Sequence, residues 1–279
     1  MPGCLYVVGT PIGNLGDMSP RAIDILRTCD FIAAEDTRVT LKLLNHFDIK
    51  KYMISYYEHN KAQKGEIICQ RILSGESCAL VTDAGMPAIS DPGQELVNRC
   101  HELNIKVIAV PGPTAFATAV AVSGLCTSRF TFEGFLSTAK KSRREHLDDI
   151  KHEKRTMVFY EAPHKLCSTL EDMLETLGNR NIVIVRELTK IHEEIIRTTF
   201  NGALEMYKET SPKGEFVLII EGVKDTDEQT EMTIDQAVLY ARQLMDNGQS
   251  ASNAAKEAAN ISGYKKSEIY KLLINMGDK

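Results

Sequence analysis

No apolar run in the 279-residue chain approaches the length of a membrane-spanning helix. The N-terminus also lacks the basic start and the apolar core of a secretory signal peptide, and residues 5–8 have the pattern of a strand instead. We therefore expect no membrane segment and a cytoplasmic protein. With 43% hydrophobic and 25% charged residues, the composition is ordinary for a globular chain, and its length suffices for two or three compact units.

The seven cysteines form no CxxC pair and no cluster with histidine. Their number is odd, and they are scattered singly along the chain. A disulfide framework would need pairs of cysteines, and a zinc site would need ligands at short spacing. The pattern predicts reduced, mostly buried thiols and no metal site.

The common phosphate-binding fingerprints are missing as well. Gly9–Asn14 follows the first predicted strand, but it is neither the Gly-x-Gly-x-x-Gly of dinucleotide-binding proteins nor a P-loop ending in Gly-Lys-Ser/Thr. Pro11 also removes a backbone N–H that would hold a phosphate oxygen. We expect no bound pyrophosphate here, and a tight structural turn explains this loop equally well when it is taken alone.

An excess of positive charge is absent, because the net charge is −5 at pH 7. The charge is nevertheless uneven, since Lys140–Arg155 holds seven basic residues against four acidic ones, a local balance of +3. Such a patch can contact phosphates whatever the overall sign of the charge. The alternative is that this charge run is only a solvated helical face.

What is present is an alternation of strand and helix patterns. Apolar strand-like runs occur at 5–8, 31–34, 78–81 and 107–110, and helical patterns lie between or after them. This alternation predicts a mostly parallel sheet that is covered on both faces. A second α/β unit begins near Arg129. The predicted organisation is an N-terminal α/β domain over 1–125, a second α/β domain over 126–223, a polar linker over 224–232 and an all-helical domain over 233–279.

The tail has the pattern of three short helices separated by glycine-containing turns at Asn247-Gly248 and Gly263. One face of the last helix is predicted to hold the apolar residues Ile269, Leu272, Leu273 and Met276. This arrangement is similar to a helix-turn-helix module, which would bind nucleic acid. A structural cap or a dimerisation arm is the alternative.

Three turn-rich loops follow three of the apolar strands, at Gly9–Asn14, Thr82–Gly93 and Pro111–Ala115. Ligands of open α/β sheets bind at the carboxyl ends of the strands. Polar groups such as Asp83 and Thr114 could hold the ends of a ligand, and their apolar neighbours could line a slot. This mixture predicts a nucleoside-like ligand without phosphates, such as S-adenosylmethionine.

Eight motifs in a fixed order resemble one known family. They are Gly9–Leu15, Ala34–Arg38, Asp83–Gly93, Val110–Ala115, Glu133–Leu136, Phe159–His164, Arg186–Lys190 and Gly214–Phe216. Together they are similar to the ribosomal small-subunit RNA 2′-O-methyltransferase I family of the tetrapyrrole methylase superfamily. The superfamily has Gly-x-Gly-Pro-Gly in its first loop. The departure from it in Gly9–Gly13 matches the RNA-modifying branch and argues against a porphyrinoid substrate.

The resemblance implies two α/β domains of the class III methyltransferase type, with S-adenosylmethionine folded in the cleft between them. It also implies methylation of the ribose 2′-hydroxyl of a cytidine in the decoding region of 16S rRNA, with 16S rRNA or the small ribosomal subunit as partner, and a homodimer. By position, the implied cofactor contacts are Pro11, Ile12, Asp83, Ala84, Gly85, Met86, Ile89, Thr114, Ala115, Tyr160, Glu161, Leu188 and Thr189.

The ribose 2′-hydroxyl is a weak acid, so a base or a charged neighbour should help to remove its proton. The candidates are Glu35, Asp36, Glu161, His164 and Lys190, of which Asp36, Glu161 and Lys190 are taken as the catalytic set. Each has a structural alternative. Asp36 can cap a turn and pair with Arg38, His164 can cap a helix, and Arg186 can pair with Glu187.

For contacts with RNA, the candidates are Arg38, Lys140, Lys141, Arg143 and Arg144. Two other functions stay open at this point. One is a tetrapyrrole C-methyltransferase of the same superfamily. The sequence of the first loop and the presence of the helical tail argue against it. The other is a non-catalytic RNA-binding protein of ribosome assembly that retains the fold.

Overall fold

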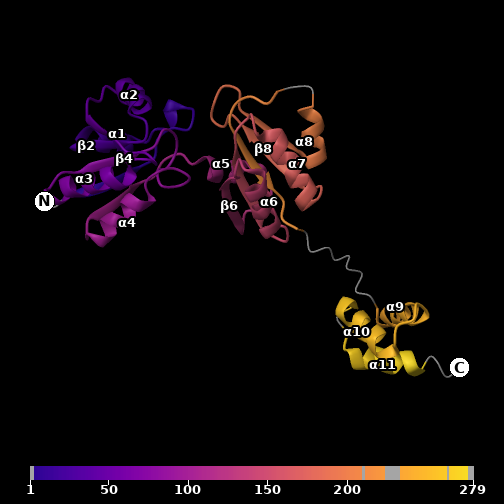
Figure 1. Cartoon of the computed structure of the whole chain (residues 1–279). Coiled ribbons are helices and arrows are strands. Elements are labelled where there is room, and N and C mark those ends of the chain that lie inside the picture. The colour runs from indigo at the N-terminus through magenta and orange to yellow at the C-terminus, as the bar shows by residue number, and fades with distance from the viewer. Residues whose placement is uncertain (1–2, 209–210, 224–232, 263, 276–279) are drawn as a thin grey trace. The chain divides into compact units, whose positions relative to one another are not determined.

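The computed structural model describes residues 3–208, 211–223, 233–262 and 264–275 (Figure 1). The chain divides into two compact units, residues 1–223 and 224–279. The first unit holds two five-stranded sheets. The expected linker at 224–232, Gly263 and Met276 lie outside the described residues. Within the described ranges, no helix has both the length and the apolar character that crossing a bilayer requires.

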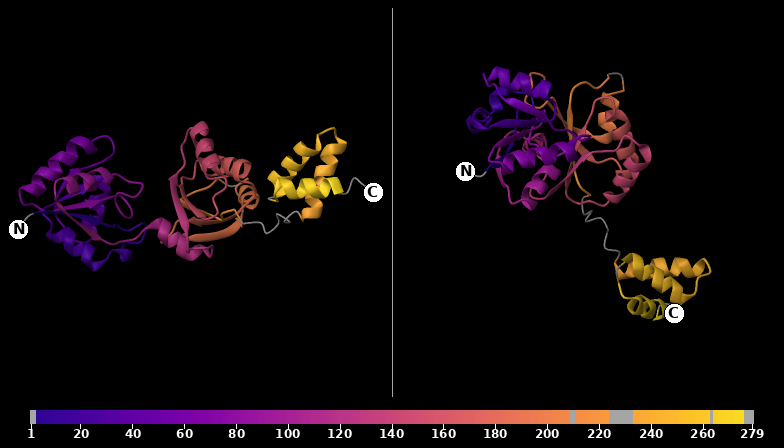
Figure 2. Two further views of the ribbon diagram at one scale, coloured as in Figure 1. Left: turned by 90° about the horizontal axis from the view of Figure 1, so that it is seen from below. Right: turned by 60° about the vertical axis from the view of Figure 1, so that its left-hand side comes forward.

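The first sheet is entirely parallel, with the strand order β3-β2-β4-β1-β5. Its strands are β1 (Cys4–Val8), β2 (Phe31–Ala34), β3 (Tyr52–Ser55), β4 (Cys78–Val81) and β5 (Lys106–Val110). Helices α1 (Pro20–Thr28) and α2 (Thr37–His46) pack on one face, and α3 (Lys61–Leu73) and α4 (Gln94–Glu102) on the other (Figure 2). The predicted parallel sheet with two covered faces is therefore confirmed.

Three elements of this part were not predicted from the sequence: the 3₁₀ turn η1 (Leu15–Asp17), α2 and β3. Strand β3 lies at the edge of the sheet, and its Tyr52 is 64% exposed, so it lacks the continuous apolar run of the central strands. The start of α2 does carry a signal, because the Asp36 side chain accepts a hydrogen bond from the Arg38 N–H as an N-cap.

The second sheet is mixed, with the order β6-β7-β10-β8-β9. Its strands are β6 (Phe130–Phe135), β7 (Thr156–Glu161), β8 (Asn181–Arg186), β9 (Glu194–Thr199) and β10 (Phe216–Ile220). Only the β6–β7 pair is parallel among the described pairs. In β10, alternate side chains point to opposite faces, and because both faces are covered, all five residues are buried.

Helices α6 (Lys140–Asp149), α7 (Leu166–Leu177) and α8 (Phe200–Met206) cover one face of the second sheet. Helix α5 (Ala115–Ser123) covers the other face, where Ala119 and Val120 pack with Val158 and Val217. The predicted boundary at residue 125 grouped α5 with the first sheet. The structure attaches it to the second sheet instead, so the chain passes between the sheets before α5 rather than after it.

The C-terminal unit consists of α9 (Ile234–Asp246), α10 (Ala251–Ser262) and α11 (Lys266–Asn275), which agrees with the three predicted helices. Helix α9 begins with a capping box made by Thr233 and Gln236. Small side chains let the helices pack closely, since Ala254 and Ala258 share a core with Ile269 and Leu273.

Candidate active site

The loops that follow β1, β4 and β5 are joined to one another through their backbones. The Thr10 N–H donates to the Gly85 carbonyl at 2.9 Å, and the Gly85 N–H donates to the Thr10 carbonyl at 3.1 Å. The Thr10 hydroxyl also donates to the Thr82 carbonyl at 3.2 Å. A Cβ on Gly9 would lie 2.7 Å from Gly112 Cα, so the first and third loops touch directly. The three loops thus form one rigid edge.

The loop Thr82–Gly93 has an unusual backbone conformation. Besides Gly85 and Gly93, the non-glycine residues Ala88 and Ser90 have positive φ values of 66° each. Such conformations cost free energy and persist only where the surroundings fix them, which is common at ligand sites. The bridge between Thr10 and Gly85 supplies part of that constraint.

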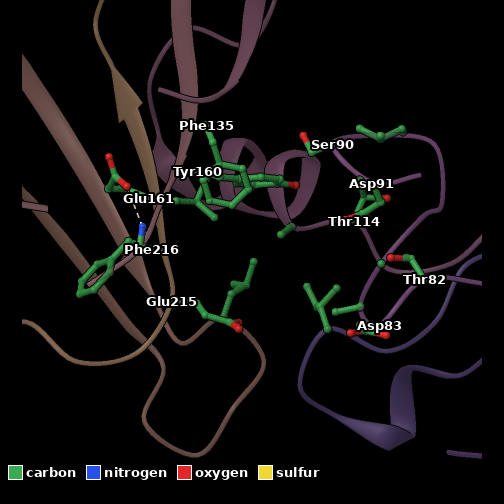
Figure 3. Close-up of a pocket in the computed structure, with 18 of the residues that line it drawn as sticks. Thr82, Asp83, Ser90, Asp91, Thr114, Phe135, Tyr160, Glu161, Glu215 and Phe216 are labelled. Atoms are coloured by element: carbon green, nitrogen blue, oxygen red, sulfur yellow. Dashed lines mark hydrogen bonds between the residues drawn. The ribbon is translucent and has the colours of Figure 1, made fainter. Parts of the chain in front are cut away.

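A cavity of about 590 Å³ opens between this loop edge and the ends of the second-sheet strands. In Figure 3, Thr82, Asp83 and Asp91 lie on one side, and Glu161, Glu215 and Phe216 lie on the other. The cavity is within the size range of small-molecule sites. Of the predicted cofactor contacts, its lining includes all but Pro11 and Thr189.

The two omitted residues belong to loops that meet beside the cavity. A Cβ on Gly13 would lie 2.9 Å from the Thr189 hydroxyl oxygen and 2.5 Å from Lys190 Cγ. Ile12 packs into the core of the second sheet with Leu188 and Val217. The first loop therefore reaches across to the second sheet and closes one end of the site.

Sequence reasoning missed several lining residues, above all Asp91 and Phe135. Asp91 was visible within the long loop, but nothing in the sequence distinguished it from a turn-forming aspartate. Phe135 was visible within the motif Glu133–Leu136, but its exposure depends on a bulge that no short pattern reveals.

Three carboxyl groups gather along the first-sheet wall. Glu35 Oε2 accepts a hydrogen bond from the Thr82 hydroxyl at 2.5 Å, and Asp83 Oδ1 accepts one from the Asp36 N–H at 3.1 Å. Burial, with repulsion from the Glu35 carboxylate, raises the pKa of Asp91 to about 6. The same two causes raise the pKa of Asp83. This wall is suited to a ligand that carries positive charge.

The opposite wall is built on Tyr160 and Glu161. The Tyr160 hydroxyl accepts a hydrogen bond from the Phe116 N–H at 3.1 Å, which fixes it to the start of α5. Glu161 is buried, and its carboxylate accepts from the Thr169 hydroxyl at 2.6 Å and pairs with Lys165 Nζ at 3.1 Å. These partners hold the Glu161 carboxylate in place in the wall.

His164 lines the cavity and is exposed, whereas α7 starts at Leu166 without any side-chain cap. The helix-capping alternative for His164 is therefore wrong.

Asp36 has the structural role that the sequence analysis gave as the alternative to a catalytic one. It caps α2, and its carboxylate pairs with the Arg38 guanidinium at 2.6 Å. The hydrogen bonds from Arg38 lower the pKa of Asp36 to about 2, which makes it a poor proton acceptor. Asp36 is not among the residues that line the cavity.

Lys190 lies beside the cavity rather than in its lining, paired with Glu187 at 2.9 Å and Glu215 at 3.0 Å. Partial burial acts to lower its pKa, but the bonds to the two carboxylates outweigh burial and raise it. The raised pKa favours the charged form of Lys190 near neutral pH. Arg186 pairs with Glu194 at 3.2 Å, so the suggested Arg186–Glu187 pair is wrong.

The basic residues predicted to contact RNA from α6 are of two kinds, exposed lysines and arginines that form ion pairs inside the domain. Lys140 and Lys141 are exposed on α6. Arg143 is buried, with its guanidinium 2.6 Å from the Asp172 carboxylate and donating to the Ser137 carbonyl. Arg144 shares Asp172 at 3.1 Å. The prediction that Arg143 contacts RNA is therefore corrected, because its charge is used inside the domain.

The comparisons with known proteins agree with this geometry. The sequence pattern of the tetrapyrrole (corrin/porphyrin) methylases matches residues 4–203. A "Ribosomal RNA small subunit methyltransferase I" of Synechocystis sp. is 46% identical over 275 residues, which are 98% of this chain and 98% of the relative. The protein of the same name from Halalkalibacterium halodurans is 47% identical over 272 residues, covering 97% of this chain and 94% of the relative.

Two solved structures share the fold of most of this chain. The uroporphyrin-III-C-methyltransferase of Thermus thermophilus matches 78% of this chain and 94% of its own, with a TM-score of 0.56 and 16% identity. A diphthine synthase matches 79% of this chain and 90% of its own, with a TM-score of 0.61 and 12% identity. From the motifs, the fold and the relatives together, the chain belongs to the ribosomal RNA small subunit methyltransferase I family of the tetrapyrrole methylases.

Proposed function

We propose that this chain is an S-adenosylmethionine-dependent methyltransferase of small-subunit rRNA, and that it methylates the ribose 2′-hydroxyl of a cytidine in the decoding region of 16S rRNA. The observation that carries the proposal is the near-full-length identity of 46–47% to proteins named for small-subunit rRNA methylation. The cytidine and its 2′-hydroxyl rest on the motif resemblance. A ribosomal substrate also fits a cytoplasmic location.

S-adenosylmethionine is the methyl donor of this family, and when bound it supplies an electrophilic methyl group on a positively charged sulfur. The residues around the cavity fit such a molecule. The carboxylates of Glu35 and Asp83 suit its positive charges, and the apolar side chains of Ile12 and Leu188 suit its nucleoside. Thr114 and the backbone groups of residues 84–86 would hold its polar ends, and Ile89 and Ala115 would line the apolar slot.

The chain's contribution to the reaction is positioning and removal of a proton. Holding the acceptor oxygen in line with the methyl carbon supplies much of the rate enhancement in such a displacement. As the new C–O bond forms and the C–S bond breaks, the hydroxyl proton must leave. The Asp91 carboxylate lines the cavity, and because its pKa is about 6 it is ionised yet basic near neutral pH. We assign it as the acceptor of that proton.

The test is transfer of label from methyl-labelled S-adenosylmethionine. The purified chain is incubated with small ribosomal subunits that lack the modification, with free 16S rRNA, or with a porphyrinoid. We expect label in the rRNA, and the comparison of the first two reactions shows which form is the substrate. Label in the porphyrinoid would favour a tetrapyrrole C-methyltransferase, and tight RNA binding without label would favour a non-catalytic assembly protein.

A homodimer is part of the same proposal, and it rests on the family resemblance alone. Sedimentation equilibrium of the full chain tests it. A molecular mass of twice 31.1 kDa is expected, and a monomer at working concentrations would contradict it.

A further inference from the structure

One aromatic side chain in the lining of the cavity is exposed. Phe135 ends strand β6, lines the cavity and is 55% exposed (Figure 3). Burying a phenylalanine is worth about 1.5–3 kcal/mol, so leaving one exposed at a concave site needs a reason other than folding.

The backbone is shaped to present this ring. The pairing of β6 with β7 shifts register between Phe132 and Gly134, and Gly134 has φ +65°. Bulges of this kind re-aim the side chains that follow them and are common beside active sites. A Cβ on Gly134 would lie 3.6 Å from the Ser90 hydroxyl oxygen, so the bulge lies against the strained loop Thr82–Gly93.

The ring is supported from within the domain. Its centroid lies 5.4 Å from that of Tyr160, whose hydroxyl is fixed by the Phe116 N–H. Lys165 Nζ lies 5.8 Å from the Phe135 centroid, and Lys165 is itself held by Glu161 and the Leu136 carbonyl. The Phe135 ring is thus held in place by Tyr160 and Lys165, and more than half of the side chain remains exposed.

A nucleobase is the chemical partner that fits such a surface. Proteins that bind single-stranded RNA stack exposed aromatic rings on bases, and each stacked base contributes substantially to binding. The cofactor that fills the same cavity is the alternative partner of the ring, and the cofactor-affinity measurement below separates the two. We propose that Phe135 stacks on the base of the acceptor nucleotide and thereby holds its ribose over the cavity, an inference that rests on the proposed function.

The experiment compares Phe135→Ala, Phe135→Leu and Phe135→Tyr with the wild-type chain. Methyl transfer to small ribosomal subunits is measured at saturating cofactor, and cofactor affinity is measured separately by calorimetry. We expect kcat/KM to fall about 10- to 100-fold in the alanine and leucine variants, mainly through KM, and to return to within about threefold in the tyrosine variant. Cofactor affinity should stay within about twofold.

The outcomes distinguish failure of the stacking role of Phe135 from failure of the proposed function. If the wild-type chain labels RNA and the alanine variant labels it equally well, the stacking role is overturned alone. If Phe135→Leu matches the wild type, bulk rather than a π face is needed, and the proposal is also overturned. Loss of cofactor affinity in Phe135→Ala would assign the ring to the cofactor wall instead. No label with the wild-type chain would overturn the proposed function and this inference with it.

Discussion

Arg143 and Asp172 form a buried ion pair, with Nη2 2.6 Å from Oδ2 and side chains that are 8% and 5% exposed. The pair joins α6 to α7, and Arg144 shares the same carboxylate at 3.1 Å. Removal of one partner from a buried pair leaves the other charge uncompensated. Arg143→Ala should therefore lower the free energy of unfolding by about 3–5 kcal/mol, measured by urea denaturation. A loss under about 1 kcal/mol would mean that the pair does not hold the two helices together.

The exposed lysines of α6 should behave in the opposite way. Lys140→Ala/Lys141→Ala should leave stability within about 0.5 kcal/mol, because neither side chain is buried. Binding of 16S rRNA should weaken, and the slope of log K against log salt should become shallower by about 0.7–0.9 for each phosphate contact that is lost. An unchanged slope would show that these lysines are only a solvated face.

The contact between the first and third loops predicts a steric effect. A methyl group on Gly9 would lie 2.7 Å from both Gly112 Cα and Met86 Sδ, which forces the loops apart. Gly9→Ala should therefore reduce cofactor affinity at least about 10-fold in calorimetry, with a stability loss of about 1–3 kcal/mol.

Gly65→Ala is the matched control for this substitution. Gly65 lies inside α3, and the added methyl would only approach Tyr56 Cε2 at 3.8 Å. This variant should gain about 0.5–1 kcal/mol of stability and bind the cofactor normally. Equal cofactor affinity in both variants would show that the Gly9–Gly112 contact does not shape the site.

Asp91 should make the protein less stable as the pH rises. Its pKa of about 6 in the folded chain exceeds the value of about 3.9 for an unfolded aspartate, so the folded chain binds the proton more tightly between these values. The contribution of Asp91 to the free energy of unfolding therefore falls as the pH rises from about 4 to 6. Asp91→Asn should be about 1–2 kcal/mol more stable than the wild type at pH 8 and should lose this advantage near pH 4.

The same variant should lose activity although its stability increases. Removal of a proton acceptor typically costs 10²- to 10⁴-fold, so we expect kcat of Asp91→Asn to fall by about that factor at pH 7.5. A variant with normal kcat would remove Asp91 from the reaction, and a variant less stable than the wild type at pH 8 would contradict the raised pKa.

The sequence was informative where strands are buried on both faces. The continuous apolar runs at Phe31–Ala34 and Cys78–Val81 predict two strands, and the structure has strands with the same bounds in which every residue is buried. The edge strand at Tyr52–Ser55 was not predicted, because only Ile54 of its four residues is buried and the apolar run is short. The ligand-binding edge was also predicted, since loops after parallel strands must meet there.

What the sequence could not reveal were partners that are distant along the chain. Arg143 belongs to a basic run, and only the fold shows that Asp172 neutralises it. Asp36 and Asp91 are both turn-region aspartates in the sequence. Their pKa values diverge because Arg38 stabilises one charge, whereas burial and Glu35 penalise the other.

The most direct test of the central claim locates the transferred methyl group. Small-subunit rRNA labelled by the full chain and methyl-labelled S-adenosylmethionine is hydrolysed with alkali, which requires a free ribose 2′-hydroxyl to cleave the strand. The account predicts that the label is recovered in an alkali-resistant dinucleotide whose 5′ residue is cytidine. Label in mononucleotides, or no label in the RNA, would contradict it.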